Sequence, residues 1–141
     1  PPPRRIAVVH GDFRSGNFLF DSTGTIRAIL DWEMCHLGDP LEDLAWGINP
    51  VWQWSRDGLA GSLLPKAEAV RIWEEGSGLR AAPDALLWWE LFSCVKGQGI
   101  WVSGGREYQE GANHGPVLGL SSWMMGNAQD RAALALLGRL A

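Results

Sequence analysis

Short apolar stretches separated by polar turns fill the first third of the chain. They predict three short strands, at Ile6–Val9, Asn17–Phe20 and Ile26–Leu30. Asp21–Gly24 is rich in turn-forming residues and joins the last two strands into a hairpin. The residues that flank this hairpin are therefore expected to lie together at one end of a small β unit.

Longer patterns typical of helices follow the strands. Asp39, Pro40 and Glu42 suit the N-cap, the first helical position and the capping-box position of a helix. That helix is expected to end near Gly47. Further helical patterns lie at Pro65–Glu75, Pro83–Val102 and Val117–Leu140. The chain is thus expected to be mostly helical with one small sheet.

The longest helical pattern has two neighbouring apolar rows, which predict a broad buried face as in a central helix. The rows are Leu87/Leu91/Cys94/Trp101 and Trp88/Phe92/Val95/Val102. Gly97 and Gly99 are attributed to close packing, because each glycine weakens a helix by about 1 kcal/mol relative to alanine. Gly104 and Gly105 are expected to end this helix.

Composition narrows the class of protein. At 141 residues, 46% of them hydrophobic and 20% charged, the chain is expected to form one soluble globular domain. A net charge of −4 predicts no nucleic-acid or anionic-membrane partner. No apolar run approaches the roughly 20 residues of a membrane span, and no signal-peptide pattern opens the chain. Cys35 and Cys94 lack metal-site spacing and are expected to be reduced thiols of a cytoplasmic protein.

Candidate chemistry lies in the segment His10–Asn17 and in Asp31, which follows the predicted hairpin. The spacing H-x-D-x-x-x-x-N matches the catalytic loop of protein kinases, with Gly11 in place of Arg, and Asp31 falls where the metal-binding Asp of D-F-G would come. Phosphoryl transfer needs one carboxylate near the attacking hydroxyl and oxygen ligands for Mg²⁺. These residues therefore indicate kinase chemistry.

The segments His10–Asn17, Leu30–Glu33 and Leu37–Ala45 together resemble the aminoglycoside phosphotransferase and choline kinase family. They look most like its branch of kinase-like domains related to those fused to acyl-CoA dehydrogenases. The resemblance implies an α+β fold, namely a protein-kinase-like C-terminal lobe, mostly helical, with a small β-hairpin unit that carries the catalytic loop. It also implies a cytoplasmic small-molecule kinase that uses ATP and Mg²⁺ to phosphorylate a substrate hydroxyl.

The resemblance implies roles for individual residues. Asp12 would be the catalytic base, and Asn17 and Asp31 would be Mg²⁺ ligands. His10 would brace the loop by hydrogen bonding to backbone near Asp31. Asp43 would form a structural hydrogen bond back to the catalytic segment.

Other polar and aromatic residues have two interpretations each. Glu33 either helps to hold metal or substrate or forms a salt bridge that supports the loop. Arg14 either contacts a phosphate or acidic substrate or is solvated. The pairs Trp52/Trp54 and Trp88/Trp89 either form an aromatic wall for a cationic ligand or pack in the core, and the core is favoured for Trp88.

The resemblance also implies parts that this chain does not show. A kinase of this family has an N-terminal lobe with a phosphate-covering loop and a lysine for the α- and β-phosphates. The two lysines, Lys66 and Lys96, both follow the motif. Residues 1–141 are therefore expected to be a partial C-terminal lobe that is inactive in isolation. Apolar surface that absent helices would cover predicts self-association or pairing with a missing N-terminal portion.

Two alternative functions stay open. The chain is either a kinase fragment or a non-catalytic kinase-like binding or regulatory module that lacks the nucleotide lobe. The presence of Asp12, Asn17 and Asp31 together argues against the second. A Mg²⁺-dependent hydrolase with Asp12 as nucleophile is a weaker third interpretation. No residue of the chain identifies the acceptor substrate.

Overall fold

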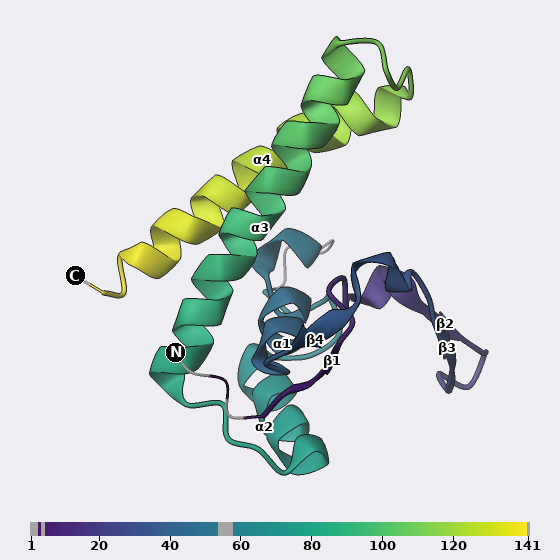
Figure 1. Ribbon diagram of the computed structural model, residues 1–141. Coiled ribbons are helices and arrows are strands. Elements are labelled where there is room, and N and C mark those ends of the chain that lie inside the picture. Colours follow the sequence, from purple (N-terminus) through teal and green to yellow (C-terminus); the bar gives the residue numbers. More distant parts are fainter. Residues whose placement is uncertain (1–2, 4, 54–57, 141) are drawn as a thin grey trace. The chain divides into compact units, whose positions relative to one another are not determined.

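The computed structural model describes residues 3, 5–53 and 58–140 (Figure 1). The strands are β1 (Ala7–Val9), β2 (Phe18–Phe20), β3 (Ile26–Ile29) and β4 (His36–Gly38), and the 3₁₀ helices are η1 (Ser15–Asn17), η2 (Trp32–Met34) and η3 (Pro50–Trp52). The α-helices are α1 (Leu41–Gly47), α2 (Lys66–Ser77), α3 (Pro83–Gln109) and α4 (Pro116–Leu137). The chain folds as two compact units, residues 1–90 and 91–141, with the boundary inside α3.

The first unit contains two small antiparallel sheets in place of the one that was predicted. β2 and β3 form the predicted hairpin, with Phe18 opposite Ile29. β1 pairs with β4, with Val8 opposite Leu37. The sequence did not predict β4, because three residues that include a glycine give no strand signal of their own. Asn17 lies at the end of η1 and not in the strand that follows it.

Helix α1 is the centre of the apolar core of the first unit. Its buried side chains cluster with Ala60, with Ala81 of the α2–α3 connection and with Ala85 and Leu86 of α3, and Trp73 of α2 packs against the cluster. The members from α1 and its C-cap are Leu41, Leu44, Ala45 and Ile48. Asp39 Oδ1 accepts a hydrogen bond from Leu41 N at 3.0 Å, but the N-cap is Pro40, so the helix begins one position later than the sequence predicted. The core therefore fixes α1, and the loop that follows β1 is hydrogen-bonded to α1 through Asp43.

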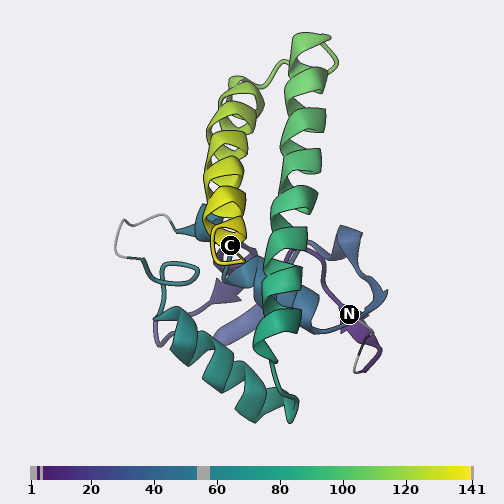
Figure 2. The same ribbon diagram turned by 90° about the vertical axis from the view of Figure 1, so that its left-hand side faces the viewer.

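In the second unit, the part of α3 after Glu90 and the helix α4 run antiparallel, side by side in both views (Figures 1 and 2). A Cβ atom at Gly104 would lie 3.0 Å from Leu118 Cδ1, and one at Gly105 would lie 3.3 Å from Ser122 Cβ. These glycines were expected to end the helix, and that prediction was wrong. They let α4 approach closely, and α3 continues to Gln109.

The predicted buried face of α3 was partly wrong. Trp88, Phe92, Val95 and Val102 are exposed, with exposed fractions of 39–69%. Ala85 and Leu86 are buried instead. Apolar residues occur all round this helix, so their spacing alone does not determine which face is covered. The close-packing explanation also fails for Gly99, whose Cβ position has no heavy atom within 4 Å.

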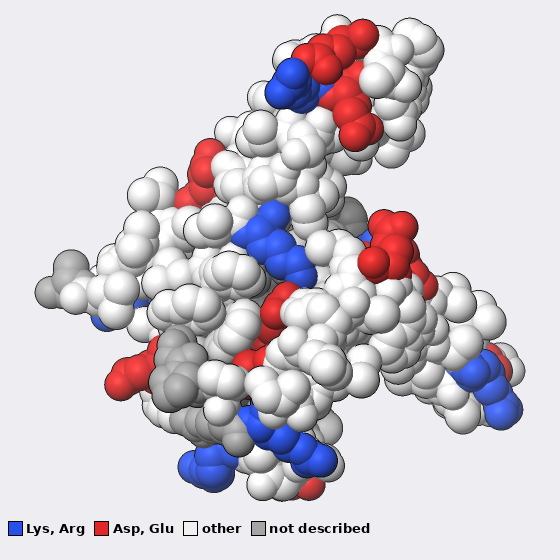
Figure 3. Space-filling view, in the orientation of Figure 1, with Lys and Arg blue, Asp and Glu red and all other residues white. Residues whose placement is uncertain are grey.

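The state of the cysteines, the hydropathy of the helices and the surface charge all bear on the predicted class of protein. Cys35 and Cys94 are free thiols, as expected. Within the described part of the chain, no helix has both the length and the apolar character needed to cross a membrane. On the face drawn in Figure 3, basic and acidic side chains form small separate groups. The expected lack of nucleic-acid and membrane partners stays a prediction.

Candidate active site

The loop that follows β1 is tied to α1 by the carboxylate of Asp43. Asp43 Oδ2 accepts a hydrogen bond from His10 N at 2.7 Å, and Oδ1 accepts one from Gly11 N at 2.9 Å. His10 Nε2 donates to the Leu30 carbonyl at 2.8 Å, and His10 Nδ1 accepts from Asp12 N at 3.1 Å. Since a carbonyl can only accept, the ring hydrogen lies on Nε2. Both nitrogens of His10 are thus engaged by backbone, including the bracing contact expected next to Asp31.

The carboxylate of Asp12 is held by three side chains. Trp46 Nε1 donates to Oδ1 at 2.7 Å, and Asn17 Nδ2 donates to Oδ2 at 2.7 Å. Arg14 Nε lies 3.2 Å from Oδ1 and 3.1 Å from Oδ2. In this structure the partner of Arg14 is therefore Asp12, so the solvated arginine considered from the sequence is not observed.

Asn17 is buried and bonded through its amide nitrogen. Besides the Asp12 carboxylate, Nδ2 donates to the Asp12 carbonyl at 2.8 Å. Oδ1 of Asn17 receives no hydrogen bond from another described residue, so it remains available as an oxygen ligand. These hydrogen bonds hold the Asn17 side chain in place through Nδ2 and leave Oδ1 without a donor among the described residues.

Asp31 follows β3, at the same open end of the hairpin as Asn17, and is exposed. Leu30 N, the neighbouring amide, donates to the Asn17 carbonyl at 2.8 Å. Trp32 Nε1 on the other side donates to the Ile29 carbonyl at 2.8 Å. Asp31 itself has φ 67° and ψ 56°, the left-handed region in which Asp is tolerated better than most residues. The backbone on both sides thus holds Asp31 beside the Asn17 segment in a conformation that few side chains accept.

The residues present fit a magnesium site better than a metal site built from protein ligands alone. Within the described ranges, no group of three or more His, Cys, Asp or Glu could hold a metal ion. Mg²⁺ commonly binds one or two protein oxygen ligands and completes its shell with water and substrate phosphates. Asn17 Oδ1 and the Asp31 carboxylate offer oxygen atoms of the kind that Mg²⁺ prefers. Glu33 is exposed in η2 and forms no ion pair with another described residue, so the supporting salt bridge is not observed.

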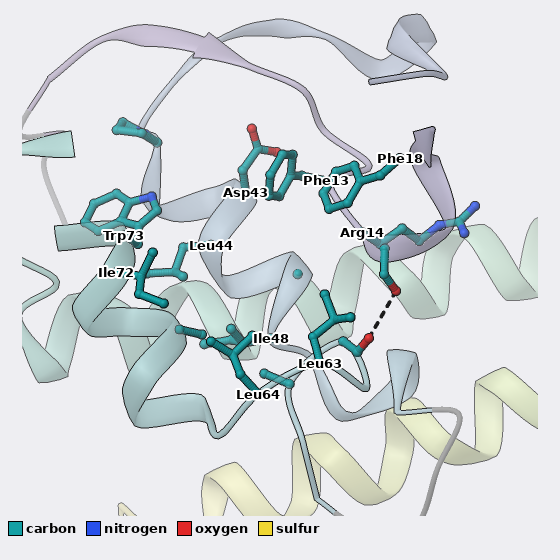
Figure 4. Close-up of a pocket in the computed structure, with 16 residues that line it drawn as sticks. Phe13, Arg14, Phe18, Asp43, Leu44, Ile48, Leu63, Leu64, Ile72 and Trp73 are labelled. Atoms are coloured by element: carbon teal, nitrogen blue, oxygen red, sulfur yellow. Dashed lines mark hydrogen bonds between the residues drawn. The ribbon is translucent and has the colours of Figure 1, made fainter. Parts of the chain in front are cut away.

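An apolar cavity of about 510 Å³ lies beside the loop within the first unit (Figure 4). Arg14 and Asp43 are its charged lining residues, and Asp43 already accepts the loop amides. Ser15 Oγ donates to the Gly61 carbonyl at 3.1 Å at its edge. Most of its lining is apolar and includes Phe13, Phe18, Leu44, Ile48, Ile72 and Trp73. Sequence patterns did not reveal this cavity, because its lining residues come from separate segments of the chain.

Sequence reasoning also missed Trp46. Its side chain is 1% exposed, and its ring centroid lies 5.3 Å from that of Trp52. The available signal was its position three residues after Asp43, since residues i and i+3 share a helix face. Trp52 is buried, with the Arg14 guanidinium 5.0 Å above its ring, and Trp54 lies outside the described residues. Trp88 is 45% exposed, so its predicted place in the core was wrong.

Comparison with curated proteins finds relatives named for acyl-CoA dehydrogenases. Mouse acyl-CoA dehydrogenase family member 10 is 45% identical over 47 residues, which are 33% of this chain and 4% of the relative. Family member 11 from Gallus gallus is 49% identical over 41 residues, 28% of this chain and 5% of the relative. Family member 11 from Pongo abelii is 31% identical over 80 residues, 56% of this chain and 9% of the relative. The matched segments are thus a small part of much longer proteins.

Solved structures share the fold. A crystal structure from Ralstonia eutropha, assigned as an aminoglycoside phosphotransferase, matches with a TM-score of 0.69 at 23% identity, over 94% of this chain and 45% of that one. A thermostable mutant of aminoglycoside phosphotransferase APH(4)-Ia matches with a TM-score of 0.55 at 23% identity, over 97% of this chain and 38% of that one. These likenesses confirm the expected α+β, kinase-like fold.

The model of the phosphotransferase enzyme family, APH, matches residues 1–81. This segment is more than half of the chain and contains every residue of the candidate site. The family resemblance inferred from the motifs is therefore confirmed. The chain belongs to the phosphotransferase enzyme family, with the kinase-like fold of aminoglycoside phosphotransferases.

Proposed function

We propose that this chain carries the catalytic segment of an ATP-dependent kinase that phosphorylates a hydroxyl group of a small molecule. The acceptor oxygen attacks the γ-phosphorus of ATP, and Asp12 takes the hydroxyl proton. The bond from that phosphorus to the bridging oxygen of the β-phosphate breaks, and ADP leaves with the electron pair. The observation that carries the proposal is the 2.7 Å bond from Asn17 Nδ2 to Asp12 Oδ2, which joins base and metal ligand into one unit.

The remaining residues act by holding this unit in place. Asn17 Oδ1 and the Asp31 carboxylate would bind Mg²⁺, which neutralises charge on the phosphates when it is bound. His10 and Asp43 fix the loop backbone through the contacts described above, and neither moves a proton. Positioning of this kind supplies much of the rate enhancement in phosphoryl transfer, because the reaction needs little covalent help from the protein.

Thermal unfolding in the presence of Mg·ATP tests whether the chain binds nucleotide. Ligand at about a hundred times its dissociation constant stabilises the native state by about 2.7 kcal/mol. The matched control is Asp31→Asn, because Asn also tolerates the left-handed backbone and removes only the charge. A shift in the parent chain that is absent in Asp31→Asn supports the metal role of Asp31. Equal shifts in both would refute it.

Turnover is measured on the whole gene product, because this chain spans 45% of the Ralstonia structure. ADP release is followed with a panel of hydroxylated acyl compounds and aminoglycosides, the two chemistries that the names of the relatives and solved structures suggest. Asp12→Ala is expected to remove most turnover and to leave nucleotide binding nearly intact. Full activity of this variant would exclude Asp12 as the base.

A non-catalytic module is the second candidate. The observation that favours it is the ion pair of Arg14 with Asp12, because the arginine lies where a hydroxyl would have to approach the carboxylate. A module of this kind would release no ADP with any acceptor, and Asp12→Ala would change neither nucleotide binding nor turnover. A trapped phosphoryl group on Asp12 would instead indicate the hydrolase.

A further inference from the structure

The hydrogen bonds to the Asp12 carboxylate determine which of its lone pairs an incoming acceptor hydroxyl can approach. Each carboxylate oxygen has two lone pairs in the carboxylate plane. Trp46 donates a hydrogen bond to one lone pair of Oδ1, and Asn17 donates one to a lone pair of Oδ2, each at 2.7 Å. Arg14 Nε takes the space between the two oxygens, at 3.2 and 3.1 Å. The carboxylate is thus held at both ends by neutral donors and in the middle by a charged one.

The three donors differ in how firmly they are held. Trp46 is 1% exposed and Asn17 is 5% exposed, so both are fixed in the interior. The Arg14 side chain is 26% exposed. An acceptor hydroxyl must come within about 2.6–3.2 Å of the base, which is the range that Arg14 Nε occupies now. Arg14 is therefore the partner that an acceptor can displace, while the two buried donors stay.

Trp46 is anchored through the helix that also anchors the loop. Asp43, three residues earlier on α1, accepts the amides of His10 and Gly11. The ring of Trp46 also packs at an angle against that of Trp52, with an interplanar angle of 62°. Helix α1 thus positions the loop backbone through Asp43 and the loop carboxylate through Trp46.

We propose that Trp46 is a positioning residue for the catalytic base. Its indole N–H fixes the rotation of the Asp12 carboxylate, so that the lone pairs now covered by Arg14 face the incoming hydroxyl. The proposal rests on the proposed function of Asp12. It assigns to Trp46 a role that is separate from its packing in the core, and the two roles can be tested separately.

The indole signal of Trp46 in a ¹⁵N-labelled chain tests the orientation without any need for activity. Trp46→Phe assigns the signal by its disappearance. Asp12→Ala removes the acceptor, so the Trp46 indole signal is expected to shift and to exchange faster with solvent. The indole signal of Trp123 on α4, in the other unit, serves as the internal control. An unchanged Trp46 signal in Asp12→Ala would overturn the proposal.

Kinetics of the whole gene product test the consequence for turnover. Loss of one hydrogen bond to a charged group is expected to lower kcat of Trp46→Phe by about 10- to 100-fold. The KM values for ATP and acceptor should stay close to those of the parent protein, because Trp46 is almost fully buried and acts through Asp12. Trp89→Phe is the matched control, since it removes the same atoms from another tryptophan packed against the core of the first unit and leaves the Asp12 bond intact.

An isosteric residue separates orientation from packing. Replacement of Trp46 by 3-benzothienylalanine keeps the ring volume and removes only the N–H donor. The same loss of kcat is expected, with a smaller loss of thermal stability than in Trp46→Phe, because the ring still fills its site. Parent-level kcat in both Trp46 variants would overturn the proposal. A parent protein that transfers no phosphate would instead refute the proposed function, and the indole signal would then decide whether Trp46 orients Asp12.

Discussion

Gly11 is the residue of the loop after β1 with the least freedom to change. Its φ is +86°, and a Cβ atom there would lie 2.5 Å from the Met34 carbonyl oxygen. Gly11→Ala is expected to lower the free energy of unfolding by about 2–5 kcal/mol, from left-handed strain and the clash together. Gly24→Ala is the control, because Gly24 has φ +81° and open space at the Cβ position. It should cost about 1–2 kcal/mol in urea unfolding.

Equal losses in the two variants would show that Met34 moves away at no cost, so that the close approach does not constrain the loop. A larger loss in Gly11→Ala would show that η2, which contains Met34, and the loop after β1 are held in contact.

The residues of the site were predictable to different degrees. Asp12, Asn17 and Asp31 could be found because a motif fixes their spacing, and Asp43 because it follows a recognisable helix start. Trp46 could not be identified, because its bond to Asp12 joins residues 34 positions apart and exists only after α1 has docked. The Arg14–Asp12 pair was missed for a different reason: the sequence does not show which partner a flexible arginine selects.

At the scale of a single element, the stability of the β2–β3 hairpin is expected to depend on pH through Asp21 in its turn. Hydrogen bonds from the Thr23 hydroxyl and amide, with smaller contributions from Arg27 and Thr25, lower the pKa of Asp21 from 3.8 to about 2. A depressed folded-state pKa means that the ionised carboxylate stabilises the hairpin above pH 3.8. That contribution is expected to be lost as the pH falls from 3.8 through about 2.

An NMR titration of the Thr23 and Thr25 amides checks this expectation. Both amides donate to Asp21 Oδ1, at 2.9 and 3.1 Å, and should report its protonation directly. Asp21→Asn should remove the transition. A midpoint near 3.8 in the parent chain would show that the turn does not hold the carboxylate as described.

Elements with strong local signals were predicted well, and those that depend on a neighbour were not. The hairpin and α1 have turn and cap residues of their own. β4 exists because β1 lies beside it. Gly104 and Gly105 lie inside a helix because α4 packs on them. In each of these cases the deciding partner lies in another segment of the chain.

At the scale of the whole molecule, the exposed apolar side chains of α4 are the feature that most needs an explanation. Leu120, Trp123 and Met124 are 58, 70 and 51% exposed, and their spacing of three and four residues places them on one face of α4. Contiguous apolar surface of this kind commonly marks an interaction site. The family model matches residues 1–81, so the match does not include α4 and indicates no function for that helix.

We expect this face to mediate association of the chain with a second copy of itself. Sedimentation velocity over a concentration series should show a reversible oligomer, and Trp123→Glu should shift it toward monomer by placing a charge in the apolar contact. Ser103→Glu adds the same charge at an exposed polar position of α3, outside the groove that Trp123 lines, and should leave the equilibrium unchanged. A parent chain that stays monomeric at the highest concentration contradicts self-association.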